Sequence, residues 1–288
     1  MAALVLLLLV LVAVPAVALL RPAAPVIGEE SVRLAAAHRS MTRWQVVGMG
    51  VGVVAAGLVA TIDGLGRGLL LAPAVLTLGV LMGVVGGQLR ISAPDGPVRS
   101  AGLAVRRVGD HLPPRLTAAV VAVTVLLVLV LLLTTALGSP DDLGRSGSAL
   151  MRQCSATSGE SRGPWPGSFY SLPLAATVLT GLALAAFTLR RIVQRPAQGE
   201  DPAVDADLRI AATRSVTAAV GLLVSVPLIG VALLSAQGLL GISCGPVWWD
   251  VVGIALLLTV PLLLTLAVWC TACLVLPLRR SVTATSAK

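Results

Sequence analysis

Residues 120–133 read VVAVTVLLVLVLLL, a run in which a single threonine is the only side chain that is not purely aliphatic. Such a run has no polar face to offer to water, so its expected solvent is lipid. Lipid provides no hydrogen-bond partners for backbone amides and carbonyls, which forces the run into a helix. Its flanks extend the apolar stretch to 117–137, long enough at ~1.5 Å per residue to cross a hydrocarbon core of ~30 Å.

The composition extends this prediction to the whole chain. Its 288 residues are 57% hydrophobic and only 12% charged, whereas about a quarter of the residues of a soluble domain are charged. We therefore predict an all-α, polytopic integral membrane helix bundle that forms one multi-pass membrane domain over residues 1–288. Seven apolar stretches are the expected transmembrane helices: 2–20, 45–62, 69–88, 117–137, 171–189, 215–236 and 249–276.

The distribution of arginine predicts the orientation of this bundle. The loops 21–44, 89–116 and 190–214, together with the tail after residue 276, carry seventeen of the 21 basic residues. Under the positive-inside rule these loops are cytoplasmic, which places the N-terminus outside and the C-terminus in the cytoplasm. Loop 138–170 is then an extracytoplasmic loop, and 281–288 is expected to be a flexible cytoplasmic tail.

The membrane expected is a plasma membrane, specifically the bacterial inner membrane. Lys288 is the only lysine among the basic residues, and a chain rich in arginine, alanine and valine suggests a GC-rich bacterial coding sequence. The basic loops would then face the anionic inner leaflet of the lipid bilayer. The stretch 2–20 has an alternative interpretation as a cleaved signal peptide, but it lacks the basic n-region of such peptides. Cleavage would also reverse every later loop.

Two of the four cysteines form a candidate disulfide. Cys154 lies in loop 138–170 and Cys244 in loop 237–248, both on the predicted outer side. Disulfides persist in such oxidising compartments, and a bond here would tie two helical hairpins together. Two unpaired thiols are the alternative. Cys270 and Cys273 form a CxxC without a second pair or a nearby histidine, so we interpret them as buried core residues.

Small residues and prolines predict how the helices pack. Glycines recur every fourth residue in two of the expected spans, a spacing that lets helix backbones approach closely, either within this chain or against a neighbouring subunit. Prolines in the middle of two later spans predict kinks, which either line a cavity or only bend the helix. The candidate packing glycines are Gly48, Gly52, Gly79, Gly83 and Gly87, and the candidate kinks are Pro227 and Pro261.

Two charged pairs are predicted near the ends of spans. Asp63 and Arg67 share the tight turn between the second and third spans and form a candidate outer ion pair; the alternative is a glycine-rich connector with two solvated charges. Asp205 and Arg209 are spaced at i, i+4 before the sixth span, which favours an ion pair on a helix that Pro202 begins.

No catalytic, cofactor-binding or metal-ligating motif stands out, so we expect neither an enzyme nor a bound cofactor. The single lysine excludes a Walker A motif, and no HExxH metal motif is present. The net charge of +8 does not indicate a nucleic-acid partner, because the arginines flank apolar spans rather than form a basic stripe with aromatic residues.

The function expected is that of a non-catalytic membrane subunit or scaffold, which acts through helix–helix contacts with other membrane subunits or with itself. The alternative is a permease or channel component for a neutral or apolar solute, with a path beside Pro227 and Pro261. The span interiors lack acidic, basic and histidine side chains, which argues against proton coupling.

Overall fold

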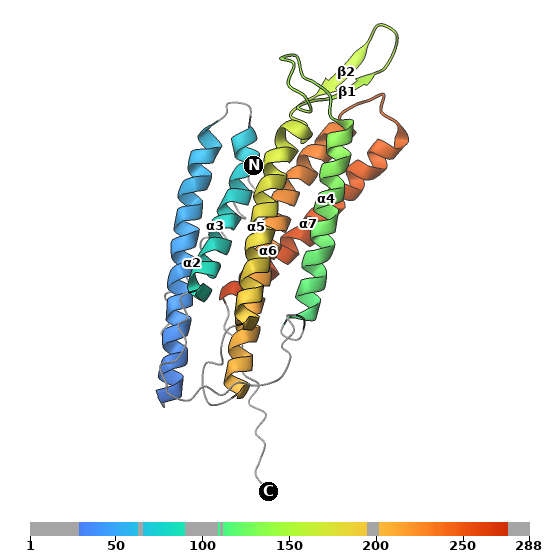
Figure 1. The fold of residues 1–288 in the computed structure, drawn as a ribbon. Coiled ribbons are helices and arrows are strands. Elements are labelled where there is room, and N and C mark those ends of the chain that lie inside the picture. Colours follow the sequence, from blue (N-terminus) through green and yellow to red (C-terminus); the bar gives the residue numbers. More distant parts are fainter. Residues whose placement is uncertain (1–28, 63–65, 90–108, 110–111, 195–201, 276–288) are drawn as a thin grey trace.

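A computed structural model describes residues 29–62, 66–89, 109, 112–194 and 202–275 (Figure 1). Within these residues, six helices are long and apolar enough to cross a membrane. They are α2 (Glu29–Thr61), α3 (Arg67–Leu89), α4 (Pro114–Leu137), α5 (Ser168–Gln194), α6 (Pro202–Leu240) and α7 (Val247–Val275). Each overlaps one predicted span, which is consistent with a helical membrane bundle. The first predicted span, 2–20, and the tail, 281–288, lie outside the described residues.

The bundle is helical, as expected, and the loop between α4 and α5 adds one feature that the sequence did not predict. Between α4 and α5 the chain forms two short antiparallel strands, β1 (Leu150–Gln153) and β2 (Gly159–Arg162). Figure 1 shows this hairpin projecting beyond the ends of α4 and α5. We call this end of the bundle the hairpin end, and the other end, where α4 and α6 begin, the opposite end.

Helix α6 forms the centre of the bundle. It contacts α3, α4, α5 and α7, and 89% of its most apolar window is buried, compared with 11% for α2. Small and branched aliphatic side chains fill its surroundings, and Leu222, Leu223, Leu228 and Leu239 are almost completely buried. Because a buried helix must be apolar on every side, this packing agrees with the lack of any charged residue over 215–236.

The five predicted packing glycines all lie in the interface between α2 and α3. A Cβ atom added to Gly48 would lie 2.5 Å from the carbonyl oxygen of Gly79, and one added to Gly52 would lie 2.7 Å from that of Leu76. Gly83 and Gly87 meet the preceding turns of α2 in the same way, at Trp44 and Met41. A side chain at Gly48, Gly52, Gly79 or Gly83 would collide with backbone, and one at Gly87 would make a tight contact at 3.3 Å. The glycines therefore permit direct contact between the two helix backbones.

A buried arginine of α6, paired with an aspartate of the same helix, joins α6 to α5 at the opposite end. The Arg209 side chain is 2% exposed, and its Nε donates to Asp205 Oδ2 at 2.7 Å, as the i, i+4 spacing predicted. Its Nη1 donates to the carbonyl oxygens of Ile192 and Val193 at 2.6 and 2.9 Å. These carbonyls lie in the last turn of α5, where backbone acceptors have no partner within the helix. Arg209 therefore caps α5 from the neighbouring helix.

Both predicted kink residues lie inside helices that continue beyond them, so kinks at these positions stay a prediction. Pro227 is buried within the bundle, whereas Pro261 lies on the exposed side of α7. Pro73 in α3 and Pro173 in α5 also lie within helices, and the sequence analysis did not single them out.

Replacement of Gly79 by leucine is expected to separate α2 from α3. The new side chain would meet the Gly52 Cα at 2.5 Å, and overpacking of a tight interface costs about 1–3 kcal/mol. The thermal midpoint of the protein in detergent should fall by several degrees. Ala255→Leu, a comparable enlargement on the exposed face of α7, is the matched control and should leave the midpoint unchanged. Equal midpoints for both variants would contradict the observed interface.

Candidate functional site

The polar residues at the hairpin end form the candidate site, which we call the cap: residues 138–167 and the α6–α7 connector, 241–246. Strand β1 pairs with β2 from Leu150 opposite Arg162 to Gln153 opposite Gly159. At the tip, Ser155 Oγ accepts hydrogen bonds from the backbone amides of Thr157 and Ser158 at 3.3 and 3.0 Å. A serine that bonds the backbone in this way stabilises a tight reversal of the chain.

Trp165 fastens the base of the cap to the bundle. Its side chain is 1% exposed, and its indole Nε1 donates to the carbonyl oxygen of Thr134 at 2.7 Å. Thr134 lies in the last turn of α4, so the tryptophan satisfies a carbonyl that α4 itself leaves unpaired. The ring also packs against Gly238 of α6, where an added Cβ would lie 2.7 Å from the indole.

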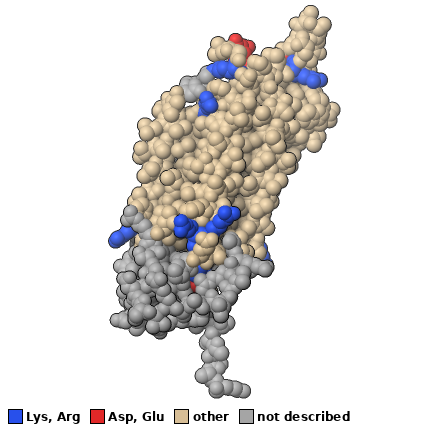
Figure 2. All heavy atoms as spheres, viewed as in Figure 1, with Lys and Arg blue, Asp and Glu red and all other residues tan. Residues whose placement is uncertain are grey.

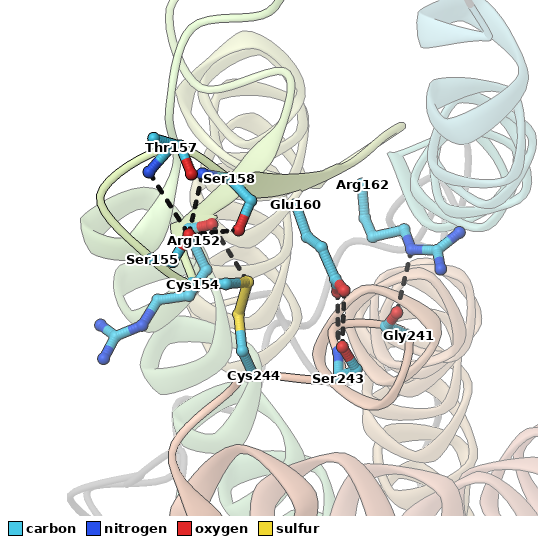
Figure 3. Close-up of a disulfide and its surroundings, with 10 residues drawn as sticks. All are labelled: Arg152, Cys154, Ser155, Thr157, Ser158, Glu160, Arg162, Gly241, Ser243 and Cys244. Carbon is cyan, nitrogen blue, oxygen red and sulfur yellow. Dashed lines mark hydrogen bonds between the residues drawn. A yellow bond between two sulfur atoms is a disulfide. The ribbon is translucent and has the colours of Figure 1, made fainter.

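The predicted cysteine pair is brought together at the hairpin. Cys154 and Cys244 are joined in a disulfide, with their Cα atoms 5.5 Å apart and 90 positions apart in the sequence. Figure 3 shows the bond between the end of β1 and the α6–α7 connector. A cross-link over so long a stretch restricts the unfolded chain strongly. It connects the α4–α5 half of the cap to the α6–α7 half.

Two polar contacts run beside the disulfide. The Glu160 carboxylate accepts hydrogen bonds from both the amide and the hydroxyl of Ser243, the former at 2.8 Å, and Arg162 Nε donates to the carbonyl oxygen of Gly241 at 3.0 Å (Figure 3). The Ser243 bonds, with the charge of Arg162 as a smaller contribution, lower the pKa of Glu160 below its usual value. Glu160 is therefore ionised at neutral pH, when its contact with Ser243 is strongest.

Arginines and Phe169 connect the cap to the other helices. The guanidinium of Arg67 lies 4.7 Å from the centre of the Phe169 ring, and that of Arg145 lies 5.8 Å from it. Arg145 also forms an i, i+4 ion pair with Asp141, which holds the pKa of that carboxyl well below its usual range. Asp63 lies outside the described residues, so its pairing with Arg67 stays a prediction.

The donors in this region do not favour a metal centre. Within the described residues, one group of possible ligands is found: Cys154, Glu160 and Cys244, whose donor atoms lie within 4.8 Å of one another. Both sulfurs are used in the disulfide, and metals bind the thiolate form of cysteine. The Glu160 carboxylate already accepts two hydrogen bonds from Ser243. These three residues therefore anchor the hairpin to the connector, through the disulfide and through the hydrogen bonds of Glu160.

No protein-family model matches the chain, and no curated protein or solved structure matches it either. The function must therefore be argued from the residues themselves. The sequence indicated Trp165 as an aromatic residue at the outer membrane interface but did not predict its buried contact with α4, and it gave no role to Glu160 or Ser243. A tryptophan between glycines and prolines after a long apolar span was the one available signal, whereas nothing in the sequence pairs Glu160 with Ser243.

The remaining cysteines serve packing. Cys270 and Cys273 are free and buried in α7, and the Cys270 sulfur occupies the space where a side chain at Gly221 of α6 would lie. This agrees with their interpretation as core residues. They also provide a matched control for the disulfide.

Replacement of Cys154 by serine is expected to loosen the cap without dissolving the bundle. Removal of a native disulfide costs about 2–5 kcal/mol in a small domain, and here the loss falls on the hairpin and the connector. Limited proteolysis of membrane vesicles open to the hairpin end should cut within 138–167 much faster than in the parent chain. Cys270→Ser should leave the cleavage rate unchanged. Equal rates for the Cys154 variant and the parent would contradict an anchoring role.

Proposed function

We propose that this chain is a non-catalytic, multi-pass membrane subunit or scaffold that acts through helix–helix contacts and through its disulfide-tied cap. The observation that carries the proposal is the filled surroundings of α6. Glycines leave a helix backbone without a covering side chain, and here neighbouring side chains cover them. Leu223 packs against Gly181 of α5, and Cys270 packs against Gly221 of α6. A bundle filled in this way supports contact between proteins better than passage of a solute.

The buried hydroxyls support the same proposal. Thr77, Thr188 and Ser225 are fully buried, and each hydroxyl donates to the carbonyl oxygen one turn earlier in its own helix, at 2.6–3.0 Å. Hydroxyls bonded in this way are turned toward their own backbone and away from any ligand. Ser235 Oγ is buried without a partner among the described residues, but a single hydroxyl does not make a path through a bundle.

The alternative, a permease or channel component for a neutral or apolar solute, requires Pro227 and Pro261 to border one path. Pro227 is enclosed by the bundle, while Pro261 lies on the exposed side of α7. The two prolines thus have different surroundings. This separation weighs against a shared path and in favour of the scaffold.

The proposed orientation places the hairpin end outside a bacterial plasma membrane. A disulfide at this end fits an oxidising compartment. Toward the opposite end, Arg115 lies in the first turn of α4, Arg190 and Arg191 lie in the last two turns of α5, and Arg43 and Arg214 lie in the first halves of α2 and α6. This distribution supports a cytoplasmic face at that end under the positive-inside rule. Figure 2 shows basic side chains near both ends on one face, with an uncharged belt between them that would contact lipid.

Exposed apolar residues around the cap provide candidate surfaces for a partner subunit. Leu143, Val247 and Trp248 are all exposed at the hairpin end, beside the projecting strands. Trp248 fits the membrane interface, where one side of its ring is wet and the other apolar. A second membrane protein, or a second copy of this chain, would bury these residues.

Native mass spectrometry of the protein in lipid nanodiscs tests the proposal. We expect assemblies of fixed stoichiometry, containing either several copies of this chain or this chain and a defined membrane partner. Val247→Glu should weaken assembly because it places a charge on an exposed apolar residue beside the cap, at the start of α7. Ser155→Ala, at the hairpin tip, is the control.

Detection of monomers alone, at every protein-to-lipid ratio tested, would contradict the proposal. Swelling of vesicles that contain the pure monomer, in a gradient of a small neutral solute and faster than for protein-free vesicles, would instead support the permease.

A further inference from the structure

Two arginines from separate parts of the chain lie beside one aromatic ring at the hairpin end. Arg67 is the first residue of α3 and Arg145 belongs to the cap, and their guanidinium carbons lie 4.7 and 5.8 Å from the centre of the Phe169 ring. Phe169 lies in the first turn of α5, which packs against α3. We call these three residues the Phe169 cluster.

The two arginines differ in how their charges are compensated. Arg145 is paired with Asp141 in the cap. Among the described residues, Arg67 forms no ion pair, and its guanidinium contacts the ring instead. A cation–π contact holds the guanidinium in position, but an aromatic ring offers no lone pair to its N–H groups. Arg67 therefore keeps a positive charge and N–H donors for an anionic ligand.

An exposed apolar stripe runs along α5 from Phe169 toward the middle of the bundle. It consists of Leu172, Ala176 and Leu179, whose spacing keeps them within about 80° of the direction of Phe169 around the helix. Leu172 is 67% exposed and Leu179 is 65% exposed. Because α5 is apolar enough to cross a membrane, the surroundings of this α5 stripe in a membrane are lipid acyl chains. The Phe169 cluster lies at the end of the stripe.

An anionic phospholipid has the complementary arrangement, a charged phosphate at the end of apolar chains. Guanidinium groups bind phosphate through charge-assisted hydrogen bonds that are often bidentate. Helices α3 and α5 both begin at the hairpin end (Figure 1), and the positive ends of their dipoles add to the attraction for an anion. Two arginines beside one ring also disfavour a headgroup that carries its own cation, such as choline, because like charges repel.

We propose that the Phe169 cluster and the α5 stripe bind one anionic phospholipid of the membrane leaflet at the hairpin end. Arg67 donates to the phosphate, Arg145 adds positive charge beside it, and an acyl chain lies along Leu172 and Leu179. The lipid thereby joins the start of α3 to the exposed side of α5. Such a site is compatible with a scaffold and with a permease, so it goes beyond the proposed function.

Titration of the full chain in a neutral detergent with phosphatidylglycerol, followed by native mass spectrometry, tests this site. We expect one adduct that forms at a lower lipid concentration than any other, and weaker binding of phosphatidylcholine. Arg67→Gln should weaken the first adduct about tenfold, the effect of losing a charge-assisted hydrogen bond, and Arg67→Lys, which keeps the charge, should weaken it less. Arg152→Gln, on the exposed strand β1 at the same end, is the control and should bind as the parent chain does.

Leu172→Gln tests the acyl-chain contact separately. This variant leaves both arginines in place and changes an exposed side chain, so the fold and the charge of the Phe169 cluster stay as they are. It should weaken the phosphatidylglycerol adduct severalfold because it places a polar group against the acyl chain. Inorganic phosphate, added as a competitor, should displace the lipid poorly because it has no acyl chain.

Three results would overturn this assignment. Equal affinity of Arg67→Gln and the parent chain would mean that another group, with Asp63 as the first candidate, already compensates Arg67. Equal affinity for phosphatidylglycerol and phosphatidylcholine would mean that the bundle does not select lipids by charge. Displacement of the lipid by an equal concentration of inorganic phosphate, with no effect of Leu172→Gln, would assign the Phe169 cluster to a free anion. Each result is distinct from failure of the proposed function, which is decided by the stoichiometry of the assemblies in nanodiscs.

Discussion

The burial of α6 is the constraint on which the rest of the structure depends. A helix enclosed by four others must satisfy the hydrogen bonds of its backbone and polar side chains internally. Its side chains must also be apolar and compact enough for the neighbouring helices to approach closely. Alanine, valine, leucine and glycine satisfy the second condition, and serine and threonine satisfy the first by bonding carbonyls of their own helix. Helices α3, α4, α5 and α7 then take their places by contact with this one helix. Among the described helices, α2 packs mainly against α3, by direct contact of the glycine backbones.

The two ends of the bundle are fixed by different chemistry. At the opposite end, Arg209 combines an ion pair with the capping of two α5 carbonyls. Loss of one partner of such a buried pair would leave the other charge uncompensated, so the contact specifies how α5 and α6 align. At the hairpin end the anchoring is covalent, through Cys154 and Cys244, and is supported by Trp165 and Glu160. The cap is therefore rigid enough to present a defined surface.

The sequence predicts those features that follow from hydropathy and spacing. Six of the apolar stretches correspond to described helices, four-residue spacing marked the glycines of the α2–α3 interface, and the topology brought Cys154 and Cys244 to the same end. The missed features depend on tertiary structure. Strands of four mostly exposed residues carry no hydrophobic alternation, and the bond between Glu160 and Ser243 spans 83 positions. The polar first turns of α2 and α6 also lie outside the predicted spans. Hydropathy identifies the part of a helix that is apolar enough to cross a membrane, and it does not identify the polar turns that precede that part.

The accessibility of α6 to water most directly distinguishes a packed scaffold from a solute path. Single cysteines at successive positions over 216–236, in a background without Cys270 and Cys273, can be exposed in native membranes to a small, membrane-impermeant thiol reagent. A packed centre predicts that none of the positions buried against α3, α4, α5 and α7 reacts until the protein is denatured. Labelling at every third or fourth position, on a stripe that includes Pro227 and Ser235, would show a water-filled route and contradict the scaffold.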